Sequence, residues 1–289
     1  MPRKTVRSPG SSGSSELSDA LLGIASDRKT GAYGLAVATL RAIARAVGPW
    51  GRDAPTRVRQ DLRKVAAQLR ETQPAMGVFR RWAIEWTRIA ADAPDRDLVP
   101  SIIRWLRSWK EQLRQEPVRL AAVARRQLPP RLRILTLSRS DSVRRALLAS
   151  GPTRRPREVI VLRSLPGGEG STFAQELRRA GLRARTVSDA EGRRMVPRAD
   201  LVLVGADAVY GDGSVVHKVG TRPLTLAALR AGVPVIVVAG RSKSVPGPCP
   251  SRTLPPRFDR TPARAVREFW TDRGVVAAAE WSRRAIRNR

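Results

Sequence analysis

The sequence predicts an α/β protein with a helical amino-terminal region packed on a parallel-sheet domain. Two observations support this fold class. Apolar residues recur at helical spacing through the first part of the chain, and short apolar runs alternate with amphipathic stretches after residue 128. Near-continuous apolar strands separated by helices are typical of a parallel sheet covered on both faces. The 289 residues, of which 42% are hydrophobic, suffice to bury such a core.

We divide the chain into a disordered Ser/Gly-rich tail (1–16), a helical amino-terminal domain (17–127) and a Rossmann-like α/β domain (128–289). The tail contains basic residues but no apolar stretch, so we expect no secretory signal there. No run of about 18 apolar residues occurs, so we expect no membrane span.

Two tryptophan pairs mark the helical domain. Trp82 and Trp86 are four residues apart, as are Trp105 and Trp109. Residues at this spacing share one face of a helix. Core or interface packing is the expected role of this stripe, and base stacking is the weaker alternative.

The α/β domain is predicted from alternating patterns. The predicted strands are Arg133–Leu137, Val159–Leu162, Ala184–Val187, Leu201–Val204 and Val235–Val238. The predicted helices are Asp141–Ser150, Ser171–Ala180, Asp189–Met195 and Pro223–Ala231. Gly151, Gly181 and Gly232 stand just past three of these helices, where a left-handed cap favours glycine.

Composition limits the function classes. Cys249 and His217 are the only residues of their kinds, so an intramolecular disulfide is impossible and a cysteine-built metal site is not expected. We expect no metal and no cofactor, and a reducing cytoplasm as the location. The net charge of +30 comes almost entirely from arginine. It indicates either weak RNA binding through a basic surface or an arginine-rich composition without a function, because no RNA-binding motif accompanies it.

The predicted strand ends indicate where chemistry lies. In open parallel sheets, ligands bind beyond the carboxyl ends of the strands. The residues that follow the predicted strands are Ser138, Arg163, Ser188, 205–207 and 240–243.

The most informative stretch is 201–221, LVLVGADAVYGDGSVVHKVGT. A hydrophobic strand precedes Gly205-Ala206-Asp207, an Asp-Gly-Ser turn follows at 212–214, and His217-Lys218-Val219-Gly220-Thr221 closes the pattern. This order and spacing resembles the signature of the translation initiation factor 2B alpha/beta/delta family, whose superfamily includes methylthioribose-1-phosphate isomerase and ribose-1,5-bisphosphate isomerase. Further elements at 30–32, 135–140, 258–262 and 271–275 keep the family's order, so the resemblance spans about residues 17 to 280.

Candidate site residues follow from these elements. Asp207 would project beyond its strand into a crevice, although a turn or cap aspartate is the alternative. Lys218 supplies a cation before a helix start, where backbone N–H groups favour an anion. The residues expected to bind ligand or phosphate are Thr30, Gly31, Ala32, Arg163, Gly205, Lys218, Gly220 and Thr221. The candidate catalytic residues are Asp207, Ser138 and His217.

The sequence departs from the isomerase pattern at one position that matters. The resemblance implies a cysteine where this chain has Ser138, and regulatory 2B subunits carry serine there. A serine hydroxyl gives up a proton far less readily than a thiol does, and proton transfer between two sugar carbons needs groups that titrate near neutral pH. His217, in place of the family's asparagine, is either a substitute acid/base or a hydrogen-bonding replacement.

These observations favour an initiation factor 2B-like protein, regulatory or binding in role, with a pocket for a sugar phosphate or nucleotide. The resemblance also implies a homodimer or higher homo-oligomer. The alternative is an aldose–ketose isomerase acting on a phosphorylated pentose, either ribose 1,5-bisphosphate or methylthioribose 1-phosphate. A third hypothesis is an RNA-associated protein that uses its positive surface.

Overall fold

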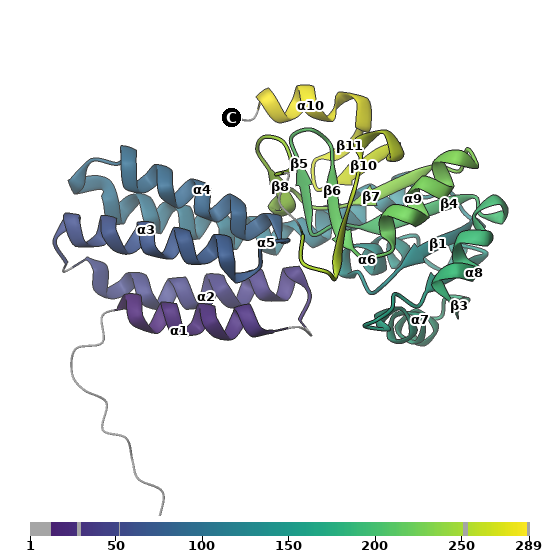
Figure 1. Cartoon of the computed structure of the whole chain (residues 1–289), viewed down its shortest axis with the longest axis horizontal. Helices are drawn as coiled ribbons and strands as arrows, with labels where there is room; N and C mark the ends of the chain where they lie inside the picture. Colours follow the sequence, from purple (N-terminus) through teal and green to yellow (C-terminus); the bar gives the residue numbers. More distant parts are fainter. Residues whose placement is uncertain (1–12, 28–29, 52, 251–253, 288–289) are drawn as a thin grey trace, which may run out of the picture. The chain divides into compact units, whose positions relative to one another are not determined.

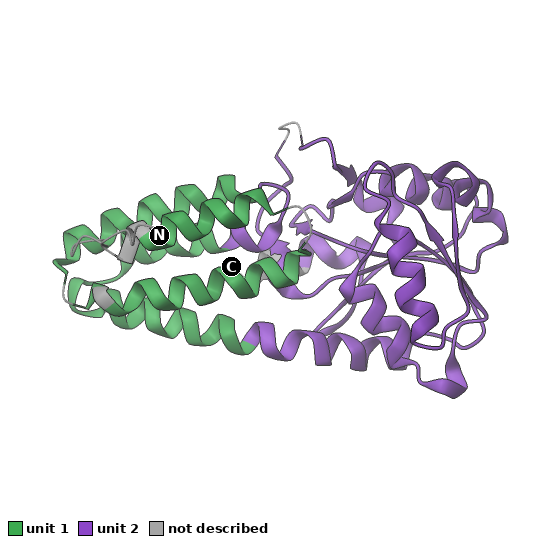
Figure 2. Ribbon diagram, turned by 90° about the horizontal axis from the view of Figure 1, so that it is seen from below, with its two compact units in different colours: residues 1–73, 82–111 green, residues 74–81, 112–289 purple. Residues whose placement is uncertain are grey.

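The computed structural model describes residues 13–27, 30–51, 53–250 and 254–287. The chain forms two compact units (Figure 2). Unit 1 comprises residues up to Gln73 together with Trp82–Glu111, and unit 2 comprises Pro74–Arg81 together with Gln112 onward. The chain passes between the units once after Gln73 and twice inside helices, whereas the boundary predicted from the sequence lies after residue 127, where the fifth helix ends.

Unit 1 is helical. Its helices are α1 (Gly13–Ser26), α2 (Ala32–Trp50), α3 (Pro55–Thr72), most of α4 (Gly77–Asp92) and the first half of α5 (Leu98–Gln127), and a short 3₁₀ helix (Asp95–Asp97) precedes α5. Trp82, Trp86, Trp105 and Trp109 are buried between α4 and α5. Their rings meet edge to face, for example at 5.6 Å between the centroids of Trp82 and Trp105. The tryptophan stripe is therefore core packing.

Unit 2 contains a seven-stranded sheet in the order β11-β10-β7-β4-β1-β2-β3 (Figure 1). Its strands are β1 (Arg133–Leu137), β2 (Glu158–Leu162), β3 (Ala184–Val187), β4 (Leu201–Gly205), β7 (Val235–Val238), β10 (Glu268–Thr271) and β11 (Gly274–Ala277). All neighbouring pairs are parallel except β10 and β11, which are antiparallel. The sheet is thus mostly parallel, with one antiparallel edge strand.

Helices cover both faces of this sheet. They are α6 (Asp141–Ala149), α7 (Glu169–Arg179), α8 (Asp189–Arg194), α9 (Thr221–Arg230) and α10 (Ala278–Arg287). Along β4, Leu201 and Leu203 pack with side chains of α5, α6 and α7. Val202 and Val204 face the opposite side and pack with α9 and with Trp281 of α10. Alternate side chains of one strand therefore enter two separate cores, which explains the unbroken apolar runs in the sequence.

A second, four-stranded sheet was not predicted. It has the order β8-β5-β6-β9 and consists of β5 (Ala208–Tyr210), β6 (Val215–Lys218), β8 (Ser244–Val245) and β9 (Phe258–Thr261). β5 and β6 form a hairpin directly after β4. The segment 201–221 therefore supplies a strand to the large sheet and a hairpin to the small one.

The predicted fold class is confirmed, since a helical amino-terminal region and a mostly parallel sheet are both present. The five predicted strands agree with β1, β2, β3, β4 and β7 to within one residue at each end. Gly151, Gly181 and Gly232 follow their helices with positive φ angles of 69°, 81° and 69°. The caps were thus predicted correctly. In the described part of the chain, no helix is long and apolar enough to cross a membrane.

Truncation of the central strand tests this packing. Leu203 of β4 has an exposed fraction of 0%. We expect Leu203→Ala to lower the free energy of unfolding by about 2–5 kcal/mol, because it removes buried methyl groups and leaves a cavity. Leu229→Ala is the matched control, since Leu229 of α9 is 45% exposed. Its effect should stay within about 0.5 kcal/mol. Urea unfolding measures both, and equal losses would contradict the assigned core.

Candidate functional site

Four strand ends meet at one edge of the large sheet. β7, β4, β1 and β2 lie side by side and are parallel, with Val204 opposite Val237 and Leu137 opposite Leu162. From β1 the chain adds β2 and β3 on one side, and β4 and β7 on the other. The strand order therefore reverses between β1 and β4, which is where parallel sheets form a ligand-binding crevice.

Asp207 lies at this reversal, two residues beyond the end of β4. Its backbone is fixed on both sides, because its N–H donates to the carbonyl of Val216 and its carbonyl accepts from Gly77 N–H, both at 2.8 Å. Burial raises the pKa of the Asp207 carboxyl, although the ammonium groups of Lys243 and Lys218 lower it. Within the described residues the carboxylate accepts no hydrogen bond. A desolvated carboxylate under the electrostatic influence of two lysines thus has no hydrogen-bond donor from the described part of the chain.

Ser138 follows β1 with a φ angle of 62°. Residues other than glycine rarely adopt this left-handed conformation, and such strain clusters at ligand sites. Ser140 caps the start of α6, where its side chain accepts a hydrogen bond from Val143 N–H. A Cβ at Gly205 would overlap the Ser140 hydroxyl, so β4 approaches the loop after β1 closely. The structure therefore brings Ser138, Gly205 and Asp207 to the same edge.

His217 is held by both ring nitrogens. Nδ1 lies 3.1 Å from the carbonyl of Gly205 and must donate to it, so Nε2 accepts from the Thr261 hydroxyl at 2.8 Å. Burial lowers the pKa of His217 to about 4, and the ring is neutral at pH 7. These contacts favour the hydrogen-bonding replacement over the substitute acid/base.

Lys218, at the end of β6, forms an ion pair with Glu169 at 2.5 Å. Glu169 begins α7, just after the loop that follows β2. The side chains are 22% and 29% exposed, so the pair is only partly solvated. Lys218, which was predicted to bind phosphate, thus already has an anionic partner from this chain.

Lys243 belongs to a 3₁₀ turn, η4 (Arg241–Lys243), that follows β7. Glu116 of α5 accepts from Ser242 N–H at 2.9 Å and from its hydroxyl at 2.7 Å. Asp272 accepts from Arg241 N–H at 2.8 Å and from its Nε at 3.0 Å. Burial raises the pKa of Glu116 although the Ser242 hydrogen bonds lower it. Two carboxylates therefore fix the turn that carries Lys243.

The helix start expected to bind phosphate is capped by the protein itself. Asp259 of β9 accepts from the N–H groups of Gly220 and Arg222 at 2.8 and 3.0 Å. The Thr221 hydroxyl donates to the carbonyl of Lys218 at 2.6 Å. Burial raises the pKa of Asp259 to about 6, and these N–H groups lower it only in part. A phosphate at Gly220 and Thr221 would have to displace this carboxylate.

The remaining predicted residues are placed differently. Arg163 follows β2 and is exposed. Thr30, Gly31 and Ala32 belong to unit 1, whereas the other predicted site residues belong to unit 2. Thr30 N–H donates to the Asp27 carboxylate at 2.9 Å, in a turn that leads into α2.

Sequence reasoning did not single out Lys243, Glu169 or Asp259. Lysine is scarce in this chain, with six residues against 49 arginines. That scarcity pointed to Lys218 and would have pointed equally to Lys243, which lies in a stretch expected beyond a strand end. Asp259 lies in the element 258–262, but neither its role nor that of Glu169 could be predicted, because their partners lie 37 to 39 and 49 positions away in the chain.

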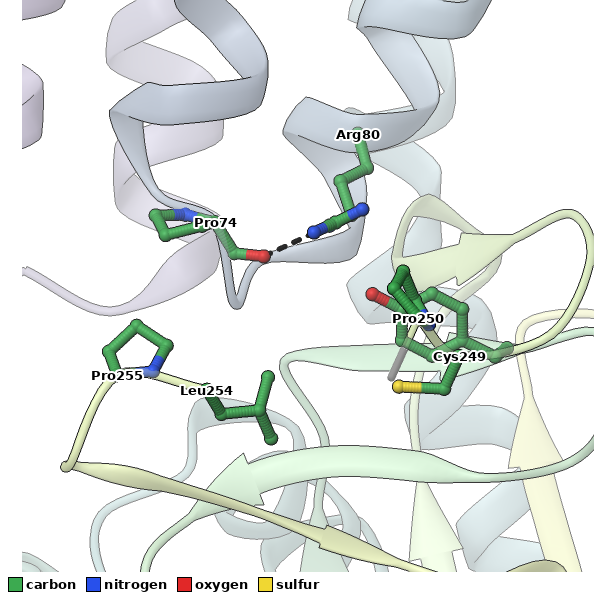
Figure 3. A pocket seen from close by; sticks show the side chains of 7 residues that line it. Pro74, Arg80, Cys249, Pro250, Leu254 and Pro255 are labelled. Carbon is green, nitrogen blue, oxygen red and sulfur yellow. Dashed lines mark hydrogen bonds between the residues drawn. The ribbon is translucent and has the colours of Figure 1, made fainter. Parts of the chain in front are cut away.

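A cavity of about 470 Å³ lies apart from these residues (Figure 3). It is lined by Pro74, Arg80, Tyr210, Cys249, Pro250, Leu254 and Pro255. None of the predicted site residues lines it. Among the described residues, no group of three or more His, Cys, Asp or Glu side chains is arranged to hold a metal ion.

Comparison with known proteins identifies a family that the chain matches. Residues 28–249 match the model of the Initiation factor 2 subunit family. Methylthioribose-1-phosphate isomerase of Gemmatimonas aurantiaca is 30% identical over 280 residues, which cover 85% of this chain and 80% of that protein. Ribose 1,5-bisphosphate isomerase of Haloferax volcanii is 27% identical over 241 residues, with 75% of each chain covered. A chain of the tetrameric eIF2B-beta2-delta2 complex from C. thermophilum superimposes with a TM-score of 0.79 at 19% identity, with 94% of each chain covered.

The Asp259 cap predicts a pH dependence. The folded state keeps the Asp259 proton up to about pH 6, whereas an unfolded aspartate releases it near pH 3.9. The unfolded state therefore binds fewer protons between these values, and stability decreases as pH rises through this window. We expect Asp259→Asn, whose amide oxygen can still accept from the two N–H groups, to lose less stability than wild type between pH 4 and 6. Urea unfolding across this range measures the difference, and parallel curves would show that Asp259 does not titrate there.

Proposed function

Because the chain belongs to the Initiation factor 2 subunit family, we propose that it is an initiation factor 2B-like protein with a regulatory or binding role. The proposed ligand is a sugar phosphate or nucleotide in the crevice beyond β1 and β4. The observation that carries the proposal is the Asp207 carboxylate, which is desolvated, accepts no hydrogen bond among the described residues and lies near Lys218 and Lys243.

Each group has a proposed role. Lys243 binds the phosphate, because its ammonium group has no ion-pair or hydrogen-bond partner within the described part of the chain. Asp207 accepts hydrogen bonds from sugar hydroxyl groups, since a carboxylate offers two acceptor oxygens. The phosphorylated pentoses named for the isomerase relatives supply both kinds of group.

The regulatory role is proposed over catalysis because of Ser138. Among the described residues, its hydroxyl group neither accepts nor donates a hydrogen bond, so no base is in place to take its proton. His217 is neutral, with both nitrogens engaged. Cys249, the only cysteine, lines the separate cavity beside Tyr210.

The second candidate function is an aldose–ketose isomerase acting on a phosphorylated pentose. The 30% identity to a methylthioribose-1-phosphate isomerase over most of both chains favours it. In this reading, Asp207 would carry the proton, because its raised pKa suits acid–base exchange better than that of an ordinary aspartate.

Ligand binding tests the main proposal. We expect at least one of ribose 1,5-bisphosphate, methylthioribose 1-phosphate, AMP, GDP or a sugar nucleotide to raise the melting temperature, because a ligand of the folded state stabilises it. Lys243→Ala should weaken that binding by about 1.5–3 kcal/mol, the contribution of a charged hydrogen bond. Lys64→Ala, at an exposed position on α3, is the control and should leave binding unchanged. A melting temperature unaffected by every compound would refute the proposal.

An isomerase assay separates the two candidate functions. We expect no turnover of ribose 1,5-bisphosphate or methylthioribose 1-phosphate by wild type or by His217→Asn. General acid–base catalysis is typically worth about 10²–10⁴-fold, and an unactivated hydroxyl forfeits most of it. Turnover that appears only in Ser138→Cys would reveal a competent pocket that lacks one proton carrier. Robust wild-type turnover would instead establish the isomerase.

A further inference from the structure

The Glu169–Lys218 ion pair places a carboxylate of this chain against a cation of the crevice. Glu169 Oε1 lies 2.5 Å from Lys218 Nζ. Glu169 Oε2 is buried and has no hydrogen-bond partner among the described residues. One oxygen thus neutralises the lysine, and the other is enclosed by the protein.

The loop before α7 holds Glu169 at this position. Gly168 adopts a left-handed conformation with a φ angle of 70°, and Glu169 is the first residue of the helix. Gly170 N–H donates to the carbonyl of Arg163 at 3.0 Å, and a Cβ at Gly170 would overlap the carbonyl of Leu162. The helix start is therefore packed directly on the end of β2. The side chain folds back over Gly167, where a Cβ would collide with the carboxylate.

The charges of the crevice then balance. Asp207 and Glu169 are acidic, and Lys218 and Lys243 are basic, so these four groups carry no net charge when all are ionised. A phosphate group carries about −1.5 to −2 at pH 7. To reach Lys218 it must displace the Glu169 carboxylate and remain near two acidic side chains. Lys243, by contrast, can accept a phosphate without breaking an ion pair of the described residues.

We infer that Glu169 determines specificity by limiting the crevice to ligands with a single phosphate group. That phosphate binds at Lys243, and hydroxyl groups of the sugar, rather than a second phosphate, face the Glu169–Lys218 pair. A neutral hydroxyl group can lie against this ion pair without adding charge beside the Glu169 carboxylate, whereas a second phosphate adds about −1.5 to −2 at pH 7. This inference rests on the proposed function and narrows its ligand to a sugar monophosphate.

Titration calorimetry with two probes tests the inference. Ribose 5-phosphate and ribose 1,5-bisphosphate are titrated into wild type, Glu169→Gln and Glu158→Gln at one salt concentration. Glu158 is the matched control, because it forms an ion pair with Arg185 at 2.7 Å and begins β2, at the opposite end of the strand that leads to Glu169.

We expect wild type to bind the monophosphate at least about tenfold more tightly than the bisphosphate. Glu169→Gln should tighten bisphosphate binding by about tenfold or more, the effect of freeing one charged hydrogen bond. Glu158→Gln should leave both affinities unchanged.

Three outcomes count against these ideas in different ways. The inference is overturned if wild type binds the bisphosphate at least as tightly as the monophosphate. It is also overturned if Glu169→Gln leaves the bisphosphate affinity unchanged. In both cases the proposed function still stands. If neither probe binds wild type, the sugar-phosphate function fails and the inference fails with it. If Glu169→Gln does not fold, the wild-type preference between the two probes still decides.

Discussion

The parallel alignment of β7, β4, β1 and β2 is the constraint on which the site depends. Parallel strands release the chain at one edge, so the loops after four strands meet there. Asp207 leaves β4 at this edge and loses much of its hydration, which would be costly for an isolated carboxylate. Nearby cations reduce that cost. Lys218 is the last residue of β6 in the small sheet, and Lys243 lies in the turn after β7.

The surroundings of the two lysines differ. Lys218 is held by Glu169, whereas Lys243 is positioned through its backbone. Glu116 and Asp272 bind Ser242 and Arg241, the residues just before Lys243, with four hydrogen bonds. Gly240 makes this possible, since a Cβ there would occupy the position of the Glu116 carboxyl. The backbone that carries Lys243 is thus fixed, and its ammonium group has no ion-pair partner among the residues that the structure describes.

Much of this could be predicted from sequence, because the signals were local. A few neighbouring residues suffice to predict the apolar strands β4 and β7 and the positive φ angle of the glycine after α6. Asp207 could be placed beyond a strand end for the same reason. β8 and β9 could not be found this way, since β8 has only two residues and β9 (FDRT) has no run of apolar residues. Both also pair with segments 35 to 46 positions distant.

Many contacts of the candidate site also join residues that are far apart in the sequence. Glu116 and Ser242 are 126 positions apart, and Glu169 and Lys218 are 49 apart. No spacing rule links such pairs before the fold is known. Likewise, the helix start at Gly220 and Thr221 looked open to an anion in the sequence, and only the pairing of β6 with β9 brings Asp259 to cap it. His217 shows the same effect, because its partners Gly205 and Thr261 arrive from two other strands.

The most direct measurement is a crystal structure of the protein with ribose 5-phosphate bound. This account predicts a phosphate oxygen at a hydrogen-bond distance of about 2.7–3.2 Å from the Lys243 ammonium group and a sugar hydroxyl on the Asp207 carboxylate. A sugar phosphate bound instead in the cavity lined by Tyr210 and Cys249, with Asp207 and Lys243 untouched, would contradict it.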